Sequence, residues 1–368
     1  MTNDVLRERW NRVRHRAAGA DADAILLAGG PDLAYLTGYE AMPLERITAF
    51  VGLIGEAEKP PWLIVPTFEI PRVQPRPELY EILGWDDTTD PVEVIAHRLP
   101  ETGTVLVSDD LWAMHVINLG MRAPRLSLEP LGDTLGGLRS IKAPTELAAI
   151  AAAGALADQV ARQLQDGAIP LVGRSEAAVA ADIAARLLTV GHDSVEFVIV
   201  ASGPNSASPH HHPGERVIEP GEMVLCDFGG KLDGYCSDTT RCVWTGRPPD
   251  EVRAAYDALH TAQESAVRAV QSGNRLCDVD WAARNALRTA GYGEYFIHRT
   301  GHGIGTEVHE HPYITEHNTA PIEIGHAFSV EPGIYLPGRW GMRIEDIVVV
   351  KPDGGHRCNN ASRELAEV

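Results

Sequence analysis

Five side chains of metal-ligand type lie in strand-like or glycine-rich contexts in the C-terminal part of the chain. They are Asp227 in LCDFGG, Asp238 in GYCSDTTR, His302 in TGHGIG, Glu331 in VEPGIY and Glu345 in RIEDIV. Four carboxylates and one imidazole are the hard and borderline ligands that hold divalent ions such as Mn²⁺, Co²⁺ or Zn²⁺. Two such ions about 3.5–4 Å apart can clamp a hydroxide and polarise a carbonyl. The set therefore predicts a two-metal site and a hydrolytic reaction.

The four carboxylates form two pairs, each separated by a turn sequence. KLDGY is a hairpin signal between Asp227 and Asp238, and LPGRWG lies between Glu331 and Glu345. Antiparallel pairing would bring each pair onto neighbouring strands, where buried carboxylates repel unless a cation lies between them. The alternatives are a surface strand pair for the aspartates and an ion pair between Glu345 and Arg343. Two matching hairpins with four carboxylates favour the metal site.

Histidines are concentrated near these acids, because nine of the fifteen lie between residues 210 and 317. His298, His302 and His309 fall within HRTGHGIGTEVHEHP, and His210 opens a run of three after SGPNSASP. A lone histidine is usually a core or surface residue, and a histidine run is often a solvated loop. The glycines around His302 allow the backbone to approach a ligand closely. GHGIG lacks the third glycine of a dinucleotide-binding loop, so we exclude such a loop here.

Composition limits the class of protein. A chain of 368 residues favours two domains, and 44% apolar with 23% charged residues is ordinary for a globular protein. The net charge of −19 argues against nucleic acid or an anionic membrane as partner. No segment has the roughly 18 apolar residues that span a bilayer. The five cysteines lack CxxC spacing and indicate reduced thiols, so we expect a cytoplasmic protein.

The N-terminal region, residues 1–135, alternates helical and strand patterns. A helix is expected over 4–18, and short apolar runs with turn residues between them predict strands at 24–28, 49–55, 62–66 and 104–108. Strands that alternate with helices are typical of an α/β domain. The polar segment GGLRSIKAPTE at 136–146 indicates the boundary to a second domain, residues 136–368.

The second region repeats one pattern of elements. Ala-rich helices are expected at 145–166 and 175–190, followed by strands at 196–203, 222–230 and 234–246. Further helices at 249–272 and 276–290 are followed by strands at 326–337 and 341–351. The order predicts two α+β halves that face each other, with a cleft into which both halves donate ligands.

These motifs, in this order, resemble the M24-type metallopeptidases with the pita-bread fold, which include proline dipeptidase, aminopeptidase P and methionine aminopeptidase. The resemblance covers about residues 140–365, and the N-terminal region with PDLAYLTGY resembles the extra domain of the Xaa-Pro branch. It implies an α+β pita-bread (creatinase/aminopeptidase) catalytic domain over 136–368. A smaller, creatinase-like N-terminal α/β domain would occupy residues 1–135.

The resemblance also implies a metal role for each ligand residue. Asp227 resembles the ligand of one metal only, and Asp238 and Glu345 resemble the ligands that bridge both metals. His302 and Glu331 resemble the ligands of the second metal. Two divalent ions are expected, Mn²⁺ first, with Co²⁺ or Zn²⁺ as alternatives.

Further residues correspond to catalytic or substrate-binding positions of that family. His210 resembles the substrate-contacting histidine, and His309 the histidine that stabilises the tetrahedral intermediate or serves the leaving group. His298 resembles a residue lining the proline pocket, and Arg343 the arginine beside the bridging glutamate. One departure is Tyr313, which stands where some prolidases carry an arginine able to bind a dipeptide's C-terminal carboxylate.

The expected activity is that of an Xaa-Pro dipeptidase (prolidase) acting on small peptides, with Glu331 as the group that accepts and passes the proton. Alternatives are an Xaa-Pro aminopeptidase (aminopeptidase P), which the departure at Tyr313 leaves open, and a non-peptidase hydrolase or lyase on the same fold. A non-catalytic binding module is disfavoured because all five ligand positions are present. The resemblance implies a homodimer, in which a partner's N-terminal domain could cap the cleft.

Overall fold

The computed structural model describes residues 2–42, 44–56, 58–135 and 137–368. The chain divides into two compact units, Met1–Arg139 and Ser140–Val368. The sequence predicted domains over 1–135 and 136–368, and residue 136, where the second predicted domain begins, lies outside the described residues.

The N-terminal unit is a mixed sheet with helices on both faces. Its strands lie in the order β4-β3-β2-β1-β5-β6. The pairs β1·β5, β5·β6 and β3·β4 are parallel, whereas β1·β2 and β2·β3 are antiparallel. The elements in chain order are α1 (Asn3–Gly19), β1 (Ala24–Ala28), α2 (Pro31–Thr37), β2 (Ala49–Leu53), β3 (Trp62–Pro66), η1 (Thr67–Arg72), β4 (Glu81–Trp85), α3 (Pro91–Ala96), β5 (Gly103–Val107), α4 (Ala113–Arg122), β6 (Leu126–Pro130) and α5 (Leu131–Leu135).

Alternate residues of β1 pack against opposite sets of helices. Ile25 and Leu27 belong to the apolar cluster that includes α1 and α2, whereas Leu26 lies in the cluster with α3 and α4. A strand that is covered on both faces has a continuous apolar sequence, and the sequence of β1, AILLA, has this pattern. The predicted α/β organisation of this region is confirmed.

The C-terminal unit contains three sets of paired strands. One sheet has the order β18-β10-β8-β7 with β9 paired to β8, a second has the order β12-β11-β13-β16-β17, and β14 pairs with β15. The elements are α6 (Pro144–Gln165), α7 (Glu176–Val190), β7 (Ser194–Ser202), η2 (Gly203–Ala207), β8 (Met223–Leu232), β9 (Tyr235–Cys236), β10 (Thr239–Trp244), α8 (Asp250–Ala269), α9 (Leu276–Thr289), η3 (Gly293–Tyr295), β11 (Gly301–Gly303), β12 (Glu310–Ile314), β13 (Ala327–Val330), β14 (Gly333–Leu336), β15 (Trp340–Arg343), β16 (Asp346–Lys351), β17 (Gly354–Arg357) and β18 (Ala366–Glu367).

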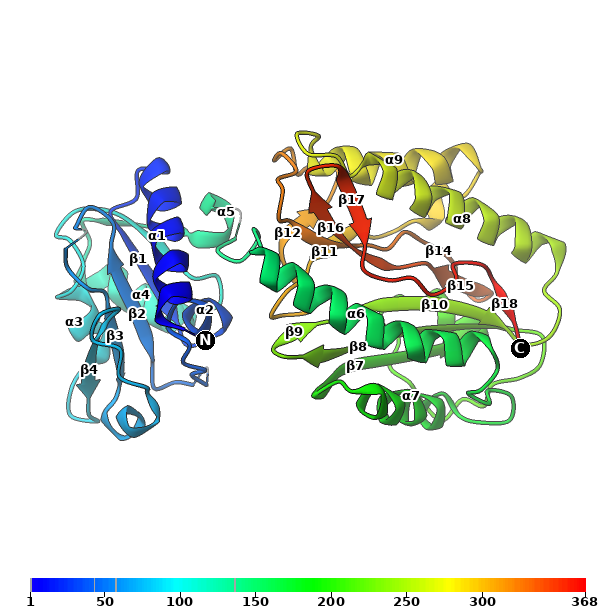
Figure 1. Ribbon diagram of the computed structural model, residues 1–368, viewed down its shortest axis with the longest axis horizontal. Helices are drawn as coiled ribbons and strands as arrows, with labels where there is room; N and C mark the ends of the chain where they lie inside the picture. Colours follow the sequence, from blue (N-terminus) through cyan, green and yellow to red (C-terminus); the bar gives the residue numbers. More distant parts are fainter. Residues whose placement is uncertain (1, 43, 57, 136) are drawn as a thin grey trace. The chain divides into compact units, whose positions relative to one another are not determined.

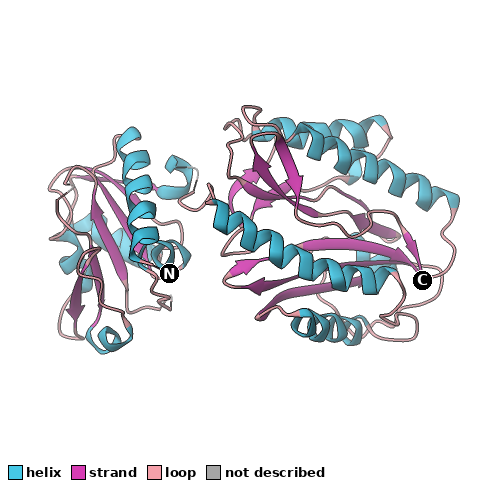
Figure 2. Ribbon diagram, in the orientation of Figure 1, coloured by secondary structure: helices cyan, strands magenta, loops and turns pink. Residues whose placement is uncertain are grey.

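This unit has the two predicted halves. Helices α6 and α7 form an apolar cluster with β7, β8 and β10, and α8 and α9 form another with β13 to β16. Figure 1 shows α8 and α9 on one side of these strands and α7 on the other. Figure 2 shows the same arrangement, with the strands in magenta enclosed by helices in cyan. The strands of both halves therefore face the interior of the unit, where a site could be built from both.

The strands predicted at 234–246, 326–337 and 341–351 are wrong in one respect, because none of them is continuous. They are divided into β9 and β10, β13 and β14, and β15 and β16 respectively. The breaks contain Asp238, Glu331 and Glu345. A break in a ladder frees the backbone to re-aim a side chain, so three acidic residues occupy positions that a regular strand would not give them.

The predicted turn and helix-start signals are present. Asp233 and Gly234 join β8 to β9 with φ of 50° and 82°, as a two-residue hairpin turn with an Asp-Gly sequence requires. The Ser175 side chain accepts a hydrogen bond from the Ala178 N–H at the start of α7. These local signals confirm the hairpin and the helix start that the sequence indicated.

The five cysteines are all buried, and no disulfide joins them in the described residues. None of the helices in those residues combines the length and the apolar character that crossing a bilayer requires.

Candidate metal centre

Both halves of the C-terminal unit contribute acidic side chains to one place. Asp227 lies within β8, and Asp238 directly precedes β10, which pairs antiparallel with β8. Glu331 and Glu345 lie just beyond the end of the β13·β16 ladder. The Glu345 N–H donates to the Thr240 carbonyl oxygen at 3.3 Å, which joins the two halves at this point. Each predicted carboxylate pair is therefore brought together by a pair of antiparallel strands, although only Asp227 lies within a strand and the other three lie directly next to one.

The five predicted ligands form one cluster. Potential ligand atoms of Asp227, Asp238 and Glu345 lie within 4.8 Å of one another, and so do those of His302, Glu331 and Glu345. His302 Nε2 is 3.6 Å from Asp238 Oδ2 and 3.5 Å from Glu331 Oε1. The same nitrogen is 4.0 Å from Glu345 Oε1. All five side chains that the sequence singled out as ligands thus meet in space.

Three carboxylate oxygens of the cluster have no hydrogen-bond partner within the described part of the chain. They are Asp227 Oδ1, Asp238 Oδ1 and Glu345 Oε1, and all three are buried. A buried charged oxygen without a partner is costly, and such groups in native proteins require an explanation. A divalent cation would satisfy all three together, so this donor set fits a metal centre.

Crowding of the buried carboxylates shifts their acidity. Burial and the carboxylate of Glu345 raise the pKa of Asp238 well above its usual range, and burial with Glu331 does the same to the pKa of Glu345. Burial raises the pKa of Glu331 to about 7 and lowers the pKa of His302 to about 3. Without a cation the cluster favours protonated acids beside a neutral imidazole, and divalent ions would supply the compensating charge.

His302 is held so that one ring nitrogen points to the acids. The backbone N–H of His302 donates to Ser329 Oγ at 3.0 Å, and the ring Nδ1 lies 3.0 Å from the Gly303 carbonyl oxygen. A proton on Nδ1 would satisfy that contact and leave Nε2 free to bind a metal. The flanking positions require glycine. A Cβ at Gly301 would lie 1.8 Å from the backbone carbonyl oxygen of Ser329, and a Cβ at Gly303 would lie 2.2 Å from the backbone carbonyl oxygen of His311.

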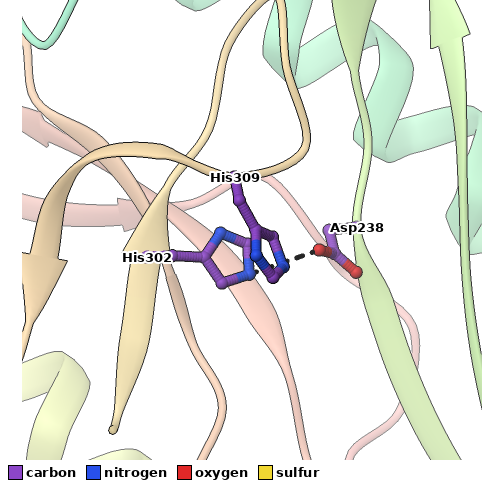
Figure 3. Close-up of side chains that lie close together, drawn as sticks. All are labelled: Asp238, His302 and His309. Carbon is purple, nitrogen blue, oxygen red and sulfur yellow. Dashed lines mark ion pairs between the residues drawn. The ribbon is translucent and has the colours of Figure 1, made fainter. Parts of the chain in front are cut away.

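His309 lies directly against His302, as Figure 3 shows together with the contact of 3.6 Å between His302 Nε2 and Asp238 Oδ2. The two imidazole centroids are 3.8 Å apart. Burial and the nearby Arg299 lower the pKa of His309, and its Nδ1 lies 3.4 Å from Arg299 Nη2. Because His309 lines the cavity beside the cluster and part of its side chain is exposed, it can contact a ligand bound there.

Arg343 is almost fully buried beside the cluster. Its Nη2 is 2.5 Å from Asp227 Oδ2, and its other nitrogens donate to Thr240 Oγ1 at 2.9 Å and to the Tyr335 hydroxyl at 3.0 Å. The Tyr335 hydroxyl also lies 2.9 Å from His298 Nε2. Burial, with Arg343 nearby, lowers the pKa of His298 to about 3, so this ring is neutral. The arginine therefore makes its closest ion pair with Asp227, and one hydrogen-bonded chain links it to His298.

The loop that carries His210 is anchored by a glutamate. Glu176 is fully buried, and its two oxygens accept hydrogen bonds from Ser202 N (2.8 Å), Ser202 Oγ (2.7 Å), Asn205 Nδ2 (3.0 Å) and Gly214 N (3.3 Å). Its Oε2 also lies 2.7 Å from His211 Nε2. Burial raises the pKa of Glu176, but the hydrogen bonds outweigh it and the net shift is downward. The loop 203–214 is thus fixed by a charged acceptor.

A cavity of about 680 Å³ connects these groups. It is lined by the five predicted ligands, by four further predicted residues (His210, His298, His309 and Arg343), and by an apolar wall that includes Phe197 and Ile199. Tyr313 lies outside the lining residues, and its ring packs against Arg299 and His311. A substrate-binding role for Tyr313 stays a prediction.

Sequence reasoning missed several residues of the site. Thr240 donates to Glu345 Oε2 at 2.7 Å, and its position two residues after Asp238 was the available signal, since alternation places both on one side of a strand. Glu176 lies at the start of the helix expected at 175–190, and the sequence assigned it no role in the site. Neither Tyr335 nor Arg299 was named, and nothing local in the sequence assigns either a partner.

Two family models match the chain. Residues 148–352 match "Metallopeptidase family M24", and residues 9–141 match "Creatinase/Prolidase N-terminal domain". The second match lies in the first unit except for residues 140 and 141, and the first match lies within the second unit, so the expected pita-bread catalytic domain with a creatinase-type N-terminal domain is confirmed.

Similar proteins cover nearly the whole chain. The "Probable dipeptidase PepE" of Mycobacterium tuberculosis is 42% identical over 363 residues, which are 96% of this chain and 95% of that protein. The "Xaa-Pro dipeptidase" of Lactobacillus helveticus is 37% identical and covers 90% of this chain and 91% of its own. The crystal structure of dipeptidase PepE from Mycobacterium ulcerans matches with a TM-score of 0.93 and 39% identity, over 100% of this chain and 99% of that one. The protein is accordingly a metallopeptidase that belongs to family M24.

Proposed function

We propose that the protein is an Xaa-Pro dipeptidase that hydrolyses the imide bond of small peptides with the help of two divalent metal ions. The observation that carries this proposal is the group of three unpartnered, buried carboxylate oxygens beside a neutral imidazole on the wall of a cavity. The names of the Mycobacterium and Lactobacillus relatives support a dipeptide substrate, and the Lactobacillus name supports proline after the cleaved bond.

The metal ions would be held by Asp227, Asp238, His302, Glu331 and Glu345. Mn²⁺ is the first expectation, with Co²⁺ or Zn²⁺ as alternatives, because this mixture of carboxylates and imidazole accepts all three. When bound, such ions supply an acidified water at neutral pH and a Lewis acid for the substrate carbonyl.

The chain's own groups would do the proton transfer. Glu331 accepts the proton of the attacking water and passes it to the leaving nitrogen, and Ser329 Oγ, 3.2 Å from Glu331 Oε1, holds the carboxylate in place. His309 donates to the carbonyl oxygen on which negative charge develops. The imide nitrogen before proline has no N–H, so the site must recognise the ring by shape.

Substrate positioning would fall to the groups around that ring. His298 lines the pocket for proline, and Arg343 orients it through the Tyr335 hydroxyl. His210 contacts the substrate from the loop 203–214, which is anchored by Glu176. A small peptide is the proposed partner; the homodimer and the cytoplasmic location stay predictions.

The test is release of the N-terminal residue from Gly-Pro, Leu-Pro and Leu-Pro-Gly, with Mn²⁺ and with a chelator. Metal-dependent cleavage of the dipeptides alone supports the proposal. Efficient cleavage of the tripeptide would instead indicate an aminopeptidase P activity. No cleavage by a metal-loaded protein would move the assignment to a non-peptidase reaction on the same fold.

A pair of variants checks the metal set. Asp238→Asn removes one charge from the cluster, and we expect it to lose both bound metal and turnover. Asp257→Asn, an exposed aspartate of α8, is the matched control and should retain both. Retained turnover in Asp238→Asn would contradict the assignment of this residue as a ligand.

A further inference from the structure

The residue that follows His309 carries a buried carboxylate that the proposed mechanism does not use. Glu310 is the first residue of β12, where it pairs with Gly303 of β11, and its side chain is almost fully buried. His309 lines the cavity, whereas Glu310 lies outside the lining residues. The two neighbours thus face different surroundings, as successive side chains of an extended chain do. A carboxylate buried in this way needs a compensating charge.

That charge comes from Lys142, which lies 168 residues earlier in the chain. Lys142 Nζ is 2.6 Å from Glu310 Oε1, and the two side chains are 2% and 3% exposed. The backbone around the lysine is fixed as well, because the Lys142 N–H donates to the Gly325 carbonyl oxygen at 2.8 Å. Ile141 also forms an antiparallel bridge with His326. The cation is therefore anchored to the segment that leads into β13.

The carboxylate of Glu310 lies against the backbone of the loop 304–310, which carries His309. A Cβ at Gly305 would lie only 2.6 Å from Glu310 Oε1, so the backbone of Gly305 passes directly beside the charged oxygen. The Glu307 N–H makes a long contact of 3.5 Å with Glu310 Oε2, and the Gly305 N–H donates to the Glu307 carbonyl oxygen at 3.1 Å. The loop is therefore folded around one end of the ion pair.

The same loop touches the acidic cluster at two points. The Gly305 carbonyl oxygen accepts a hydrogen bond of 2.8 Å from the N–H of Cys236, which is two residues before Asp238. Near the other end of the loop, the centroid of the His309 ring lies 3.8 Å from that of His302. A displacement of the loop would therefore move the His309 ring relative to the proposed ligands.

We propose that Lys142 and Glu310 are positioning residues, whose ion pair holds the loop 304–310 so that the His309 imidazole reaches the carbonyl oxygen of the cleaved bond. This inference rests on the proposed function and adds to it a pair of residues outside the cavity. The pair can fix the loop because any displacement separates two opposite charges that water does not reach, and an unpaired buried charge is strongly unfavourable.

The first experiment measures kcat and KM for Leu-Pro with the Mn²⁺-loaded full chain. The main variant is Lys142→Met/Glu310→Met, because a single change would leave one buried charge unpaired, whereas an apolar pair of similar volume is often tolerated. Thermal unfolding should give a Tm close to that of the wild type. We expect kcat to fall by about 10- to 100-fold, because a small misplacement of a catalytic group costs about that much.

Two further readouts should stay unchanged in this variant. KM should differ little from the wild-type value, because His309 acts on charge that develops only in the transition state. Metal content should also be retained, because none of the five proposed ligands lies in the loop 304–310. Lys351→Met, at an exposed lysine that ends β16, is the matched control and should leave kcat and Tm unchanged.

A double-mutant cycle separates positioning of His309 from general support of the fold. His309→Ala should lower kcat by about 100- to 1000-fold, as the loss of one donor to a developing oxyanion does. If the ion pair acts through His309, Lys142→Met/Glu310→Met should lower kcat by less than about 2-fold further in the His309→Ala background. Lys142→Arg keeps both charges and provides a second folded variant. Its longer side chain should give an intermediate loss of kcat that also disappears in that background.

Hydrogen exchange measured by mass spectrometry provides a readout that needs no turnover. In Lys142→Met/Glu310→Met, peptides that cover the loop 304–310 should exchange about 10-fold faster than in the wild type, because the contact that fixes the loop is lost. Peptides from β8 and β16 should exchange at wild-type rates. Faster exchange throughout the C-terminal unit would instead show a general loss of stability and overturn the positioning role.

The outcomes separate this inference from the function on which it rests. A wild-type kcat in the double variant, or wild-type exchange in its loop, would overturn the role of the ion pair and leave Xaa-Pro hydrolysis intact. The same conclusion follows if the variant lowers kcat by equal factors with and without His309. Failure of the metal-loaded wild type to cleave any Xaa-Pro peptide would overturn the proposed function, and the catalytic role of the ion pair with it.

Discussion

Replacement of Glu176 by glutamine should both destabilise the protein and impair catalysis. The carboxylate is buried at the start of α7 and accepts hydrogen bonds from Ser202, Asn205 and Gly214, while His211 contacts its second oxygen. These donors belong to the end of β7 and to the loop 203–214, which brings His210 and His211 to the cavity. The substitution therefore tests whether a charged acceptor behind the loop is needed to hold it.

The expected loss follows from the donors that glutamine cannot serve. Its single amide oxygen can still accept from Ser202, but its N–H₂ group would face the Gly214 N–H and the Asn205 amide. Hydrogen bonds to a charged group contribute about 1.5–3 kcal/mol each, and a change of tautomer in His211 recovers one of the lost contacts. We therefore expect a loss of about 2–4 kcal/mol in the free energy of unfolding. For a domain of this size that corresponds to a fall of about 5–15 °C in Tm.

The effect should depend on pH in a defined direction. The hydrogen bonds hold the pKa of Glu176 below its ordinary value of 4.5 in the folded protein. A group whose folded-state pKa is depressed stabilises the protein above its unfolded pKa, and this stability is lost as the pH falls through the folded-state pKa. The Tm difference between wild type and Glu176→Gln should thus be full near neutral pH and shrink as the solution is acidified below about pH 4.5.

Scanning fluorimetry from pH 8 to well below pH 4.5 measures the stability, and hydrolysis of Leu-Pro at pH 7 measures the consequence for the loop. We expect a kcat/KM reduced by about 10-fold or more, because His210, the proposed substrate-contacting residue of the loop, is no longer fixed. Glu323→Gln, which removes an exposed carboxylate in the same unit, should change neither quantity. An unchanged Tm in Glu176→Gln, or a Tm loss that does not diminish in acid, would refute the reasoning.

Three further changes test the metal centre. At a concentration of about 100 times its Kd, a divalent ion should stabilise the protein by about 2.7 kcal/mol and raise Tm by about 5–10 °C. If EDTA does not lower the Tm of the metal-loaded protein, metal binding at this site is contradicted. Arg343→Lys should lower kcat/KM by about 100-fold, because lysine cannot bind Asp227 and the hydroxyl groups together; metal analysis should find occupancy changed less than turnover. Gly301→Ala would place a Cβ 1.8 Å from the backbone carbonyl oxygen of Ser329, so β11 must shift and we expect metal binding to be lost. Gly120→Ala, where no other atom lies within 4 Å of the new Cβ, should retain both the fold and metal binding.

The elements that could be predicted from the sequence are those with a continuous apolar run or a helical repeat. The two edge strands of the N-terminal sheet, β4 and β6, were not predicted. Each is only partly buried, and each includes a glutamate, with a glycine in β4 and a proline in β6. An edge strand needs no unbroken apolar pattern, because one of its sides is not paired. The three-residue strand β11 is too short to have any periodicity.

The residues of the candidate site also fall into those that a local sequence pattern predicts and those that it does not. The five ligands could be predicted from the sequence because acidic residues and a histidine, spaced around turns, are unusual in strands whose apolar pattern predicts burial. Residues that support them were not accessible. The position of Thr240 two residues after Asp238 was a signal for the site, but its partner Glu345 is distant along the chain, and so are the partners of Glu176 in the loop 203–214. No local pattern encodes such partners, and the fold alone supplies them.

The acidic cluster also lies on the seam between the two halves of the C-terminal unit, which links metal binding to the cohesion of that unit. Arg343 of the second half reaches Asp227 of the first at 2.5 Å, and Arg241 of the first half reaches the Glu345 carbonyl oxygen at 2.7 Å. A ligand of each half is therefore held by a cation from the other. Any change that loosens this seam moves ligands apart before it unfolds either half, so metal affinity should fall earlier than secondary structure does. Bound metal would in turn add a bond across the same interface, because its proposed ligands come from both halves, and should oppose its opening.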